Sequence, residues 1–174
     1  MIYDALRLLK ERRSVKKYKD DQISEEQLDR ILEAGLYAAS GKNGQKTIML
    51  AVTKKEDVKM LSKLNAEILG VDMDPFYNAP AVIVVFADKN HPTYLEDGSL
   101  VLGNLMTEAF SIGVDSCWIH RAKQMFETEK GRVYARAHGI PDDYVGIGNC
   151  VLGFKEGNLP ECKPRREGRI IKVI

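Results

Sequence analysis

Two continuous apolar runs dominate the hydrophobic pattern, and both predict strands of a buried sheet. Residues 81–87 read AVIVVFA and residues 47–53 read TIMLAVT, with many β-branched side chains. A strand that is apolar at every position is typical of a sheet covered by helices on both faces. Two further strands are predicted at residues 115–120, DSCWIH, and within residues 140–154, IPDDYVGIGNCVLGF. We therefore expect a central sheet of about four strands.

A stripe of apolar and small residues at helical spacing predicts a helix over residues 23–40. The stripe positions recur at i, i+3, i+4, i+7 and i+8, so they share one face that packs on the core. They are Leu28, Ile31, Leu32, Gly35 and Leu36. Ser24 and Gln27 form the S-x-x-Q pattern of a capping box, which marks the start of this helix. A polar loop with two glycines, residues 40–46, is expected to end it.

Four more helices are predicted from similar signals. Thr53 and Glu56 repeat the capping-box pattern before a helix that ends near Leu69. The others are expected over residues 3–12, 95–112 and 126–139, the last ended by Gly139. A sheet among helices predicts an α+β or α/β sandwich. The apolar end of the chain, IIKVI, fits an edge strand on this chain or on a partner.

Composition places the chain among ordinary globular proteins and limits its partners. The 174 residues are 44% hydrophobic and 29% charged, and the formal net charge is +1. Such balanced charge argues against binding nucleic acid by bulk electrostatics. The three cysteines have no C-x-x-C spacing, so the simplest interpretation is a reduced, cytoplasmic setting without disulfides. The first residues are too charged for a signal peptide, and no apolar run approaches the ~20 residues of a membrane span.

Positive charge is concentrated at two places in this nearly neutral chain. The first group consists of Arg12, Arg13, Lys16, Lys17 and Lys19, and the second of Lys163, Arg165, Arg166 and Arg169. A helix end explains one or two such cations, which favour the negative end of the helix dipole. Either group alone fits a solvated surface. Together they predict convergence on one anion, and arginine forks with lysine charges suit a phosphate.

The polar loop and the third predicted strand carry further candidates for binding. Asn43 and Gln45 offer amides that donate and accept hydrogen bonds, which suits the edge of a heteroaromatic ring, although such residues also solvate loops. Trp118 either fills the core or ends a strand whose backbone N–H groups face a ligand. The sequence has no H-E-x-x-H, G-x-S-x-G or G-x-G-x-x-G motif and its histidines are scattered, so no metal site or Rossmann site is predicted.

Taken in order, these segments resemble the FMN-dependent nitroreductase family. The segments are RRSVKKY, ISEEQLDRILEAGLYAASGKNGQ, DPFYNAPAVIVV, GVDSCWI, GIPDDYVGIGNCVLGF and KPRR. Each is a weak signal alone, but the ordered set covers nearly the whole chain. The resemblance implies one FMN-binding domain, residues 1–174, of the α+β class: a three-layer sandwich with a central, mostly antiparallel sheet between helices. It also implies an intertwined homodimer with two FMN sites at its interface.

The resemblance assigns FMN-binding roles to the candidate residues. The segment implied to hold the phosphate, the ribityl chain and the pyrimidine edge of the ring consists of Arg12, Arg13, Ser14 and Lys16. A late pair implied to complete the phosphate grip consists of Lys163 and Arg165. A loop supplied by the other subunit consists of Ser40, Asn43 and Gln45. The segment whose backbone faces the ring near N5 consists of Trp118, Ile119 and His120.

The implied activity is the reduction of a small electron-poor acceptor, such as a nitro compound or a quinone, by NADH or NADPH. The nicotinamide would pass hydride to FMN and leave before the acceptor enters, a two-step ping-pong reaction in which Lys16 stabilises the reduced ring. The chain departs from the family in lacking prolines around the loop, in its short length, and in placing His120 and Arg121 where glycine is common. Arg121 is therefore a candidate for binding an anionic group of the acceptor or donor.

Two alternatives stay open at this level. One is a flavoenzyme of the same fold with different chemistry, such as dehalogenation or ring dehydrogenation. The other is a non-enzymatic protein that binds an anion or a nucleotide through its basic groups. Neither a nucleic-acid nor a membrane partner is expected.

Overall fold

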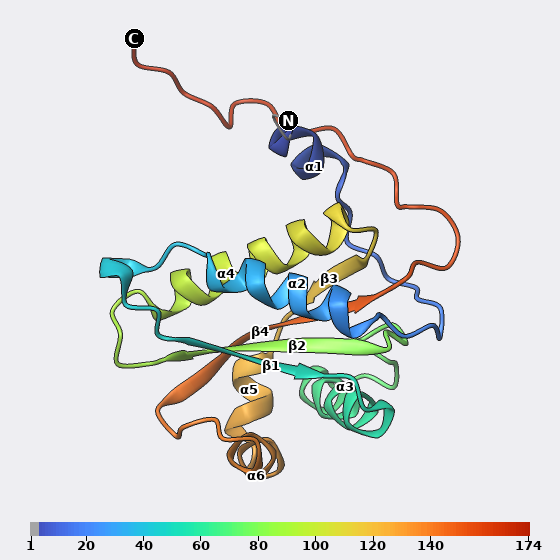
Figure 1. The fold of residues 1–174 in the computed structure, drawn as a ribbon, viewed down its shortest axis with the longest axis vertical. Coiled ribbons are helices and arrows are strands. Elements are labelled where there is room, and N and C mark those ends of the chain that lie inside the picture. The colour runs from blue at the N-terminus through green and yellow to red at the C-terminus, as the bar shows by residue number, and fades with distance from the viewer. Residues whose placement is uncertain (1–3) are drawn as a thin grey trace.

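The computed structural model describes residues 4–174, which form three layers with a sheet between two groups of helices (Figure 1). Four strands lie in the order β1-β2-β4-β3, and each neighbouring pair is antiparallel. They are β1 (Thr47–Val52), β2 (Ala81–Asp88), β3 (Asp115–Ile119) and β4 (Tyr144–Gly153). One face is covered by α2 (Glu25–Leu36) and α4 (Tyr94–Ser111). The other is covered by α3 (Lys55–Leu69), α5 (Ala122–Glu127) and α6 (Glu129–Ala137). This confirms the predicted α+β sandwich.

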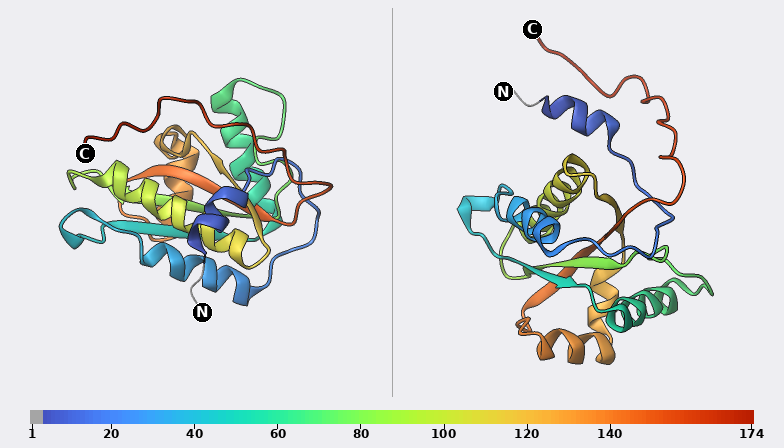
Figure 2. Two further views of the ribbon diagram at one scale, coloured as in Figure 1. Left: turned by 90° about the horizontal axis from the view of Figure 1, so that it is seen from above. Right: turned by 45° about the vertical axis from the view of Figure 1, so that its right-hand side comes forward.

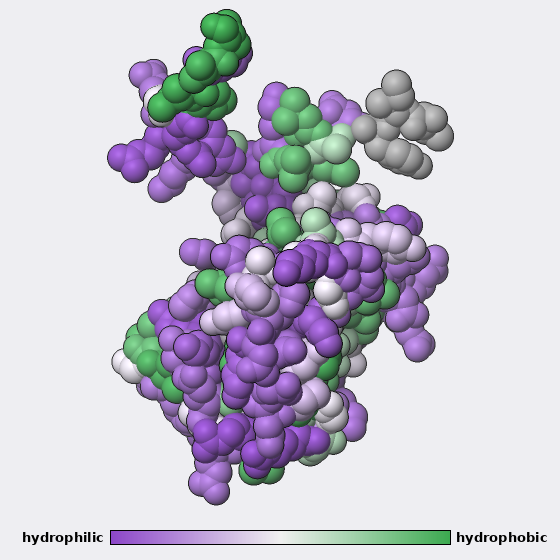
Figure 3. Space-filling model, turned by 90° about the vertical axis from the view of Figure 1, so that its left-hand side faces the viewer, coloured by the Kyte–Doolittle hydropathy of each residue, from purple (hydrophilic) through white to green (hydrophobic). Residues whose placement is uncertain are grey.

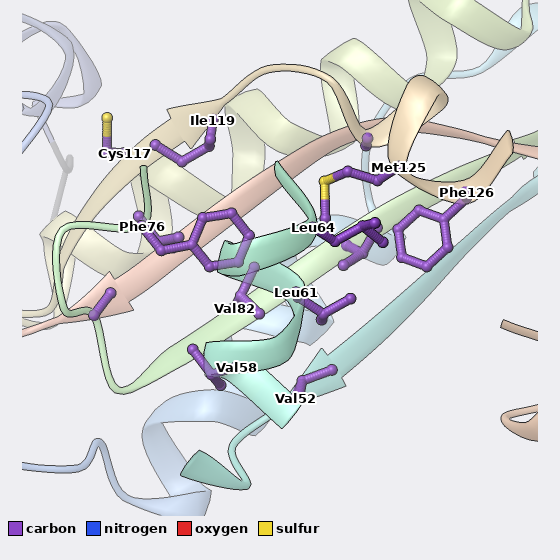
Figure 4. Close-up of a cluster of buried hydrophobic side chains, with 14 of the residues drawn as sticks. Val52, Val58, Leu61, Leu64, Phe76, Val82, Cys117, Ile119, Met125 and Phe126 are labelled. Carbon is purple, nitrogen blue, oxygen red and sulfur yellow. The ribbon is translucent and has the colours of Figure 1, made fainter. Parts of the chain in front are cut away.

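The central strand β2 is buried on both faces because its alternate side chains enter two different cores. Val82 and Val84 join the cluster under α3 and α5, whereas Ile83 and Val85 join the cluster under α2 and α4. Figure 4 shows side chains of α3 and α5 gathered in the first of these clusters. Burial on both sides accounts for the continuous apolar pattern of this strand.

The capping pattern predicts one helix start correctly and another wrongly. The capping box of Ser24 and Gln27 forms in both directions at the start of α2. The one predicted for Thr53 and Glu56 does not form, because α3 begins at Lys55 and its N-cap residue is Lys54. Thr53 is instead part of the connection after β1, and its carbonyl accepts a hydrogen bond from the side chain of Gln22.

The predicted burial of the α2 stripe holds in the middle of the helix and fails at its end. Ile31 and Gly35 are buried under α4, but Leu36 is 72% exposed. Leu36 is the last residue of α2, where the helix passes into the loop that follows. The core of a single chain therefore does not cover the last position of the stripe.

The single helix predicted over residues 126–139 is two helices, α5 and α6. They are divided at Thr128, which has extended backbone angles and caps α6 by accepting a hydrogen bond from Gly131 N at 3.0 Å. Gly131 has no room for a side chain, because a Cβ there would lie 2.0 Å from the carbonyl oxygen of Met125. Gly139 follows α6 with a φ of 80°, which confirms its predicted role as terminator.

The two ends of the described chain extend from the same side of the molecule (Figure 2). Helix α1 (Ala5–Glu11) lies beyond the α2–α4 layer, and the first residue of its predicted range, Tyr3, falls outside the described residues. The tail beyond residue 156 is exposed, and its apolar end forms the green patch at the top of Figure 3. Within residues 4–174 no helix has both the length and the apolar character to cross a bilayer.

The tail does not form the edge strand predicted for it on this chain. Phe154 and Glu156 are hydrogen-bonded to the backbone of residues 17–19, and the chain then leaves the body. The free edge of β3 is already used, because Ser14 bridges to Ser116 there. Pairing of the tail with a partner stays a prediction.

Candidate functional site

The basic segment after α1 is held as an extended strand along the edge of β3. Ser14 pairs with Ser116 in a parallel bridge, and Val15 N donates a hydrogen bond to Ser116 O at 3.0 Å. Val15 is buried in the core, whereas Ser14 and Lys16 on either side of it are exposed. Alternation along an extended chain thus directs the hydroxyl and the ammonium group away from the core.

Two adjacent arginines in this segment have different surroundings. Arg13 Nη1 donates to the carbonyl oxygens of Lys10 at 2.6 Å and Arg12 at 2.8 Å, so it completes the C-terminal end of α1. Among residues 4–174, Arg12 Nη1 is buried and has no hydrogen-bond partner, and the buried hydroxyl of Ser116 also lacks one. A buried donor without an acceptor is costly, and part of a cation more so. Arg12 therefore has unused capacity to bind an anion.

The pKa of the buried thiol of Cys117, in β3, is affected by the charges of this segment. Burial raises the pKa of Cys117, and a hydrogen bond from Ser14 together with the positive charges of Lys16 and Arg12 lowers it in part. Lys16 Nζ also lies 5.9 Å from the centroid of the Tyr77 ring, within the range of a cation–π interaction. One end of the sheet thus gathers two cations, a hydroxyl and an aromatic face.

Tyr77 and its neighbour Asn78 belong to this site and were not predicted. Both have positive φ angles, 56° and 60°, which side chains other than glycine rarely adopt. The carboxylate of Asp74 stabilises the turn by accepting hydrogen bonds from the backbone N–H groups of Phe76 and Asn78, and the hydroxyl of Ser62 donates to it. Asp and Asn in DPFYNAP are turn residues, but nothing in the sequence connects this turn with Lys16.

The end of β3 presents an exposed surface beside the basic segment. Trp118 is 36% exposed, so it does not fill the core. Ile119 is buried and His120 is exposed. The side chains therefore alternate as in a strand, and the aromatic and imidazole groups face outward at the same end of β3.

The turn after β3 is fixed by two fully buried asparagines. Asn65 Nδ2 donates to His120 O at 2.7 Å, and Asn149 Nδ2 donates to Ile119 O at 3.1 Å. The next residue, Arg121, has a φ of 76° and serves as the N-cap of α5. The carbonyls before this left-handed residue are thus anchored to α3 and β4, which restricts the backbone that the turn presents.

The loop of residues 40–45 lies at the opposite end of the sheet from the basic segment (Figure 1). β1 begins just after this loop, and its first residue, Thr47, pairs with Ala87 near one end of β2. The basic segment meets β3 at Ser116. Ser116 is level with Ala81, at the other end of β2, because both residues pair with Leu152 of β4. Six residues of a strand span about 20 Å at ~3.3 Å per residue. Ser40, Asn43 and Gln45 therefore do not join the Arg12 site of their own chain.

The late basic pair is also apart from this site within one chain. Lys163 and Arg165 lie in the exposed tail, and over residues 4–174 neither makes a hydrogen bond or an ion pair with the basic segment. The predicted convergence of the two basic groups is therefore not present in the single chain. Nor do the described residues contain a group of three His, Cys, Asp or Glu side chains that could hold a metal ion.

Comparison with known proteins relates this arrangement to one family. A sequence model of the Nitroreductase family matches residues 9–154. An Archaeoglobus fulgidus protein, by name an NADH dehydrogenase/NAD(P)H nitroreductase, is 30% identical over 156 residues, which cover 87% of this chain and 85% of that protein. The crystal structure of a Bacteroides fragilis nitroreductase with bound FMN superposes with a TM-score of 0.90 at 27% identity, covering 98% of each chain. A Desulfitobacterium hafniense nitroreductase structure shares the fold, with a TM-score of 0.87 at 24% identity over 99% of this chain and 100% of the other.

Proposed function

Since the chain belongs to the nitroreductase family, we propose that it is an FMN-dependent oxidoreductase that uses NADH or NADPH to reduce a small electron-poor acceptor, such as a nitro compound or a quinone. The Bacteroides fragilis relative binds FMN, and the Archaeoglobus fulgidus relative is named for NAD(P)H. In this chain the supporting observation is Arg12 Nη1, a buried cationic donor that has no acceptor in the part of the chain that the structure describes. A phosphate beside β3 supplies that acceptor.

The residues of the site fit the chemistry of FMN. We assign the phosphate and ribityl chain to the segment Arg12, Arg13 and Ser14, and the pyrimidine edge of the ring to Lys16 with Tyr77. We assign the region near N5 to the end of β3, formed by Trp118, Ile119 and His120. Arg12 carries the unsatisfied donor and Lys16 already lies against an aromatic face, so both cations are available to a ligand that joins a phosphate to an aromatic ring.

A second copy of the chain is needed to complete this site. The loop residues Ser40, Asn43 and Gln45 lie about 20 Å along the sheet from their own basic segment, so they serve the site of a partner. The tail pair Lys163 and Arg165 completes the phosphate grip in the same assembly. Exposed apolar side chains on the α2–α4 side and on the tail would be buried between the copies: Leu36, Tyr37, Leu95, Leu100, Ile170 and Ile171. The proposed unit is a homodimer of single FMN-binding domains, each comprising residues 1–174.

In the proposed mechanism, FMN held by these residues would supply the chemistry of hydride transfer between NAD(P)H and the acceptor. The contribution of the chain is to bind and orient. Lys16 supplies a fixed positive charge where the ring gains electrons, and preorganised charge of this kind is worth a few kcal/mol. Arg121, beside the exposed His120, attracts an anionic group of the donor or acceptor. Donor and acceptor use one open face in turn, as a ping-pong reaction requires.

The visible absorption spectrum of the purified protein, before and after anaerobic NADH or NADPH, tests this proposal. Flavin bands that bleach with one of the nicotinamides are the expected result. Bands that persist with both would retain the cofactor but favour another donor or an oxidative reaction of the same fold. A colourless protein that takes up no added FMN would overturn the proposal and favour a non-enzymatic anion-binding role.

A further inference from the structure

The loop of residues 40–45 rests on a compact polar cluster contributed by the start of α4 and the segment before it. Asp97, in the first turn of α4, is only 3% exposed, and its Oδ1 accepts a hydrogen bond from Gly41 N at 3.0 Å. His91 Nε2 lies 3.2 Å from Gly41 O and 3.4 Å from Asp97 Oδ2. Both backbone groups of Gly41 are therefore held by side chains that follow it by 50 residues or more.

The loop fits this cluster so closely that its glycines have no room for a side chain. A Cβ at Gly41 would lie 2.1 Å from Thr93 Oγ1, and a Cβ at Gly44 would lie 2.8 Å from His91 Cε1. Neither glycine has a positive φ, so close approach explains them and backbone conformation does not. The two glycines thus allow the backbone of the loop to lie directly on His91 and Thr93.

Three residues of the loop are held in an unfavourable backbone conformation. Lys42, Asn43 and Gln45 have φ angles of 52°, 53° and 50°, in the left-handed region that residues other than glycine adopt at a cost. Gln45 Nε2 donates to Asn43 Oδ1 at 3.0 Å, and Gln45 N donates to Ser40 Oγ at 3.2 Å. Such a conformation persists only where the surroundings determine it, and the contacts to Gly41 provide that constraint.

Asp97 is a buried carboxylate that lies outside the basic site, so its burial needs an explanation from its surroundings. Burying a charge is unfavourable unless it is paired and hydrogen-bonded. The positive end of the α4 dipole and the N–H of Gly41 stabilise the carboxylate, and the ring of His91 lies beside its Oδ2, which has no hydrogen-bond partner among residues 4–174. The N–H of Gly41 belongs to the loop, and His91 contacts both the loop and Asp97. The buried carboxylate and the loop conformation therefore stabilise each other.

We propose that Asp97 and His91 are positioning residues that fix the loop of residues 40–45 in the conformation that presents Asn43 and Gln45 to the cofactor site of a second copy. This rests on the proposed function, which places those amides at the flavin. A loop that is ordered before binding pays less conformational entropy when the cofactor arrives. His91 and Asp97 therefore act on flavin affinity without touching the flavin.

Limited trypsin digestion of the FMN-free protein tests the constraint on the loop directly. Lys42 and Lys46 are exposed cleavage sites within or next to the loop, and mass spectrometry distinguishes cuts there from cuts elsewhere. We expect His91→Leu to be cleaved about tenfold faster at these lysines, because Gly41 O loses its hydrogen-bond partner and Asp97 loses the polar ring beside it. His91→Gln keeps a donor for Gly41 O and should cleave at nearly the wild-type rate.

His138→Leu is the matched control for the loss of a histidine. His138 Nδ1 lies 2.8 Å from Tyr134 O at the end of α6, so it makes a comparable contact with a backbone carbonyl elsewhere in the molecule. Its loss should leave cleavage after Lys42 and Lys46 unchanged.

A second pair of variants tests the packing of the loop and does not alter His91. Gly41→Ala drives a methyl group into Thr93 Oγ1 and should loosen the loop. Gly41→Ala combined with Thr93→Ala removes that hydroxyl, which is buried and has no hydrogen-bond partner within residues 4–174, and should restore resistance to trypsin. Failure of the double variant to regain resistance would overturn the close-packing argument.

The same variants are then titrated with FMN, with flavin fluorescence as the readout. We expect the dissociation constant to rise about tenfold in His91→Leu and Gly41→Ala, and to return toward wild type in His91→Gln and the double variant. Unchanged trypsin cleavage would overturn the role of Asp97 and His91 in holding the loop. Faster cleavage with an unchanged dissociation constant would overturn the link to the flavin. A wild-type protein that binds no FMN would instead refute the proposed function, while the digestion still decides whether the loop is held.

Discussion

Replacing Arg12 with methionine should have opposite effects on the FMN-free and the FMN-bound protein. In the FMN-free chain Arg12 Nη1 is buried without a partner among the described residues, and an unsatisfied buried donor of this kind costs about 1–3 kcal/mol. Methionine keeps an unbranched side chain of similar length in a half-buried position and removes that donor. The free energy of unfolding of the FMN-free protein should therefore stay the same or rise by about 1 kcal/mol.

Binding of FMN should weaken in the same variant. A charge-assisted hydrogen bond to phosphate contributes about 1.5–3 kcal/mol, which corresponds to a dissociation constant about 10- to 150-fold higher. Urea denaturation of the FMN-free protein measures the first effect, and quenching of flavin fluorescence measures the second. Increased or unchanged stability with weakened binding is the expected combination.

Arg13→Met is the informative comparison, because Arg13 is the adjacent cation. Its guanidinium donates to two carbonyl oxygens at the end of α1, so its loss should lower the stability of the FMN-free protein and weaken FMN less than the Arg12 change does. If Arg12→Met destabilises the FMN-free protein and leaves FMN affinity intact, Arg12 is a structural residue and the assignment of the phosphate site is wrong.

Three further outcomes are expected. Lys16→Ala should retain FMN but slow its anaerobic reduction by NAD(P)H about 10²-fold; unchanged stopped-flow traces would remove Lys16 from that role. Gly131→Ala should lower the melting temperature, because its Cβ would meet a carbonyl oxygen at 2.0 Å, whereas Gly103→Ala, with open space in α4, should not. Ellman's reagent should label Cys162 alone in the native protein, because burial raises the pKa of Cys150 to about 12 and Cys162 is exposed; equal labelling of all thiols would contradict the buried core.

The parts of the fold that sequence predicts correctly are those determined by local pattern. The run of residues 81–87 is continuously apolar because β2 is covered on both faces, and the box of Ser24 and Gln27 closes on itself within four residues. The division between α5 and α6 was not predicted, because it depends on the contact of Gly131 with the backbone of α5. The helix-forming pattern of residues 126–139 does not reveal this close contact between the backbones of α5 and α6.

The sequence identifies candidate residues of the site, but it does not predict the contacts or the positions that distinguish them. The sequence marks Arg12 and Arg13 as equal cations, whereas in the structure the guanidinium of Arg13 binds helix carbonyls and Arg12 Nη1 has no partner among residues 4–174. Likewise, the sequence offers Asn43 and Gln45 as binding groups but not their position at the far end of the sheet. That position follows from strand register, which no local pattern specifies.

Backbone strain in the described chain is confined to the segments assigned to the cofactor. Over residues 4–174, the non-glycine residues with positive φ are Lys42, Asn43, Gln45, Tyr77, Asn78 and Arg121. The first three belong to the loop, the next two to the turn beside Lys16, and the last to the turn after β3. Strain of this kind clusters at functional sites because the surrounding structure must hold it in place. All three segments are ones to which the proposed function assigns a ligand-binding role.

Several buried polar side chains form hydrogen bonds to the strained segments. Within the described part of the chain the buried polar residues are Ser62, Asn65, Asp97, Asp115, Ser116 and Asn149. Asp97 holds the loop, Ser62 binds Asp74 in the Tyr77 turn, and the two asparagines hold the carbonyls before Arg121. Ser116 accepts the basic segment through its backbone, and Asp115 accepts a hydrogen bond from the start of the tail. A buried polar group usually has a hydrogen-bond partner; the partners of Ser62, Asp97 and the two asparagines lie in the candidate site, whereas the hydroxyl of Ser116 has none among residues 4–174. These buried groups therefore connect the core to the loop and the turns that the proposed function assigns to the site.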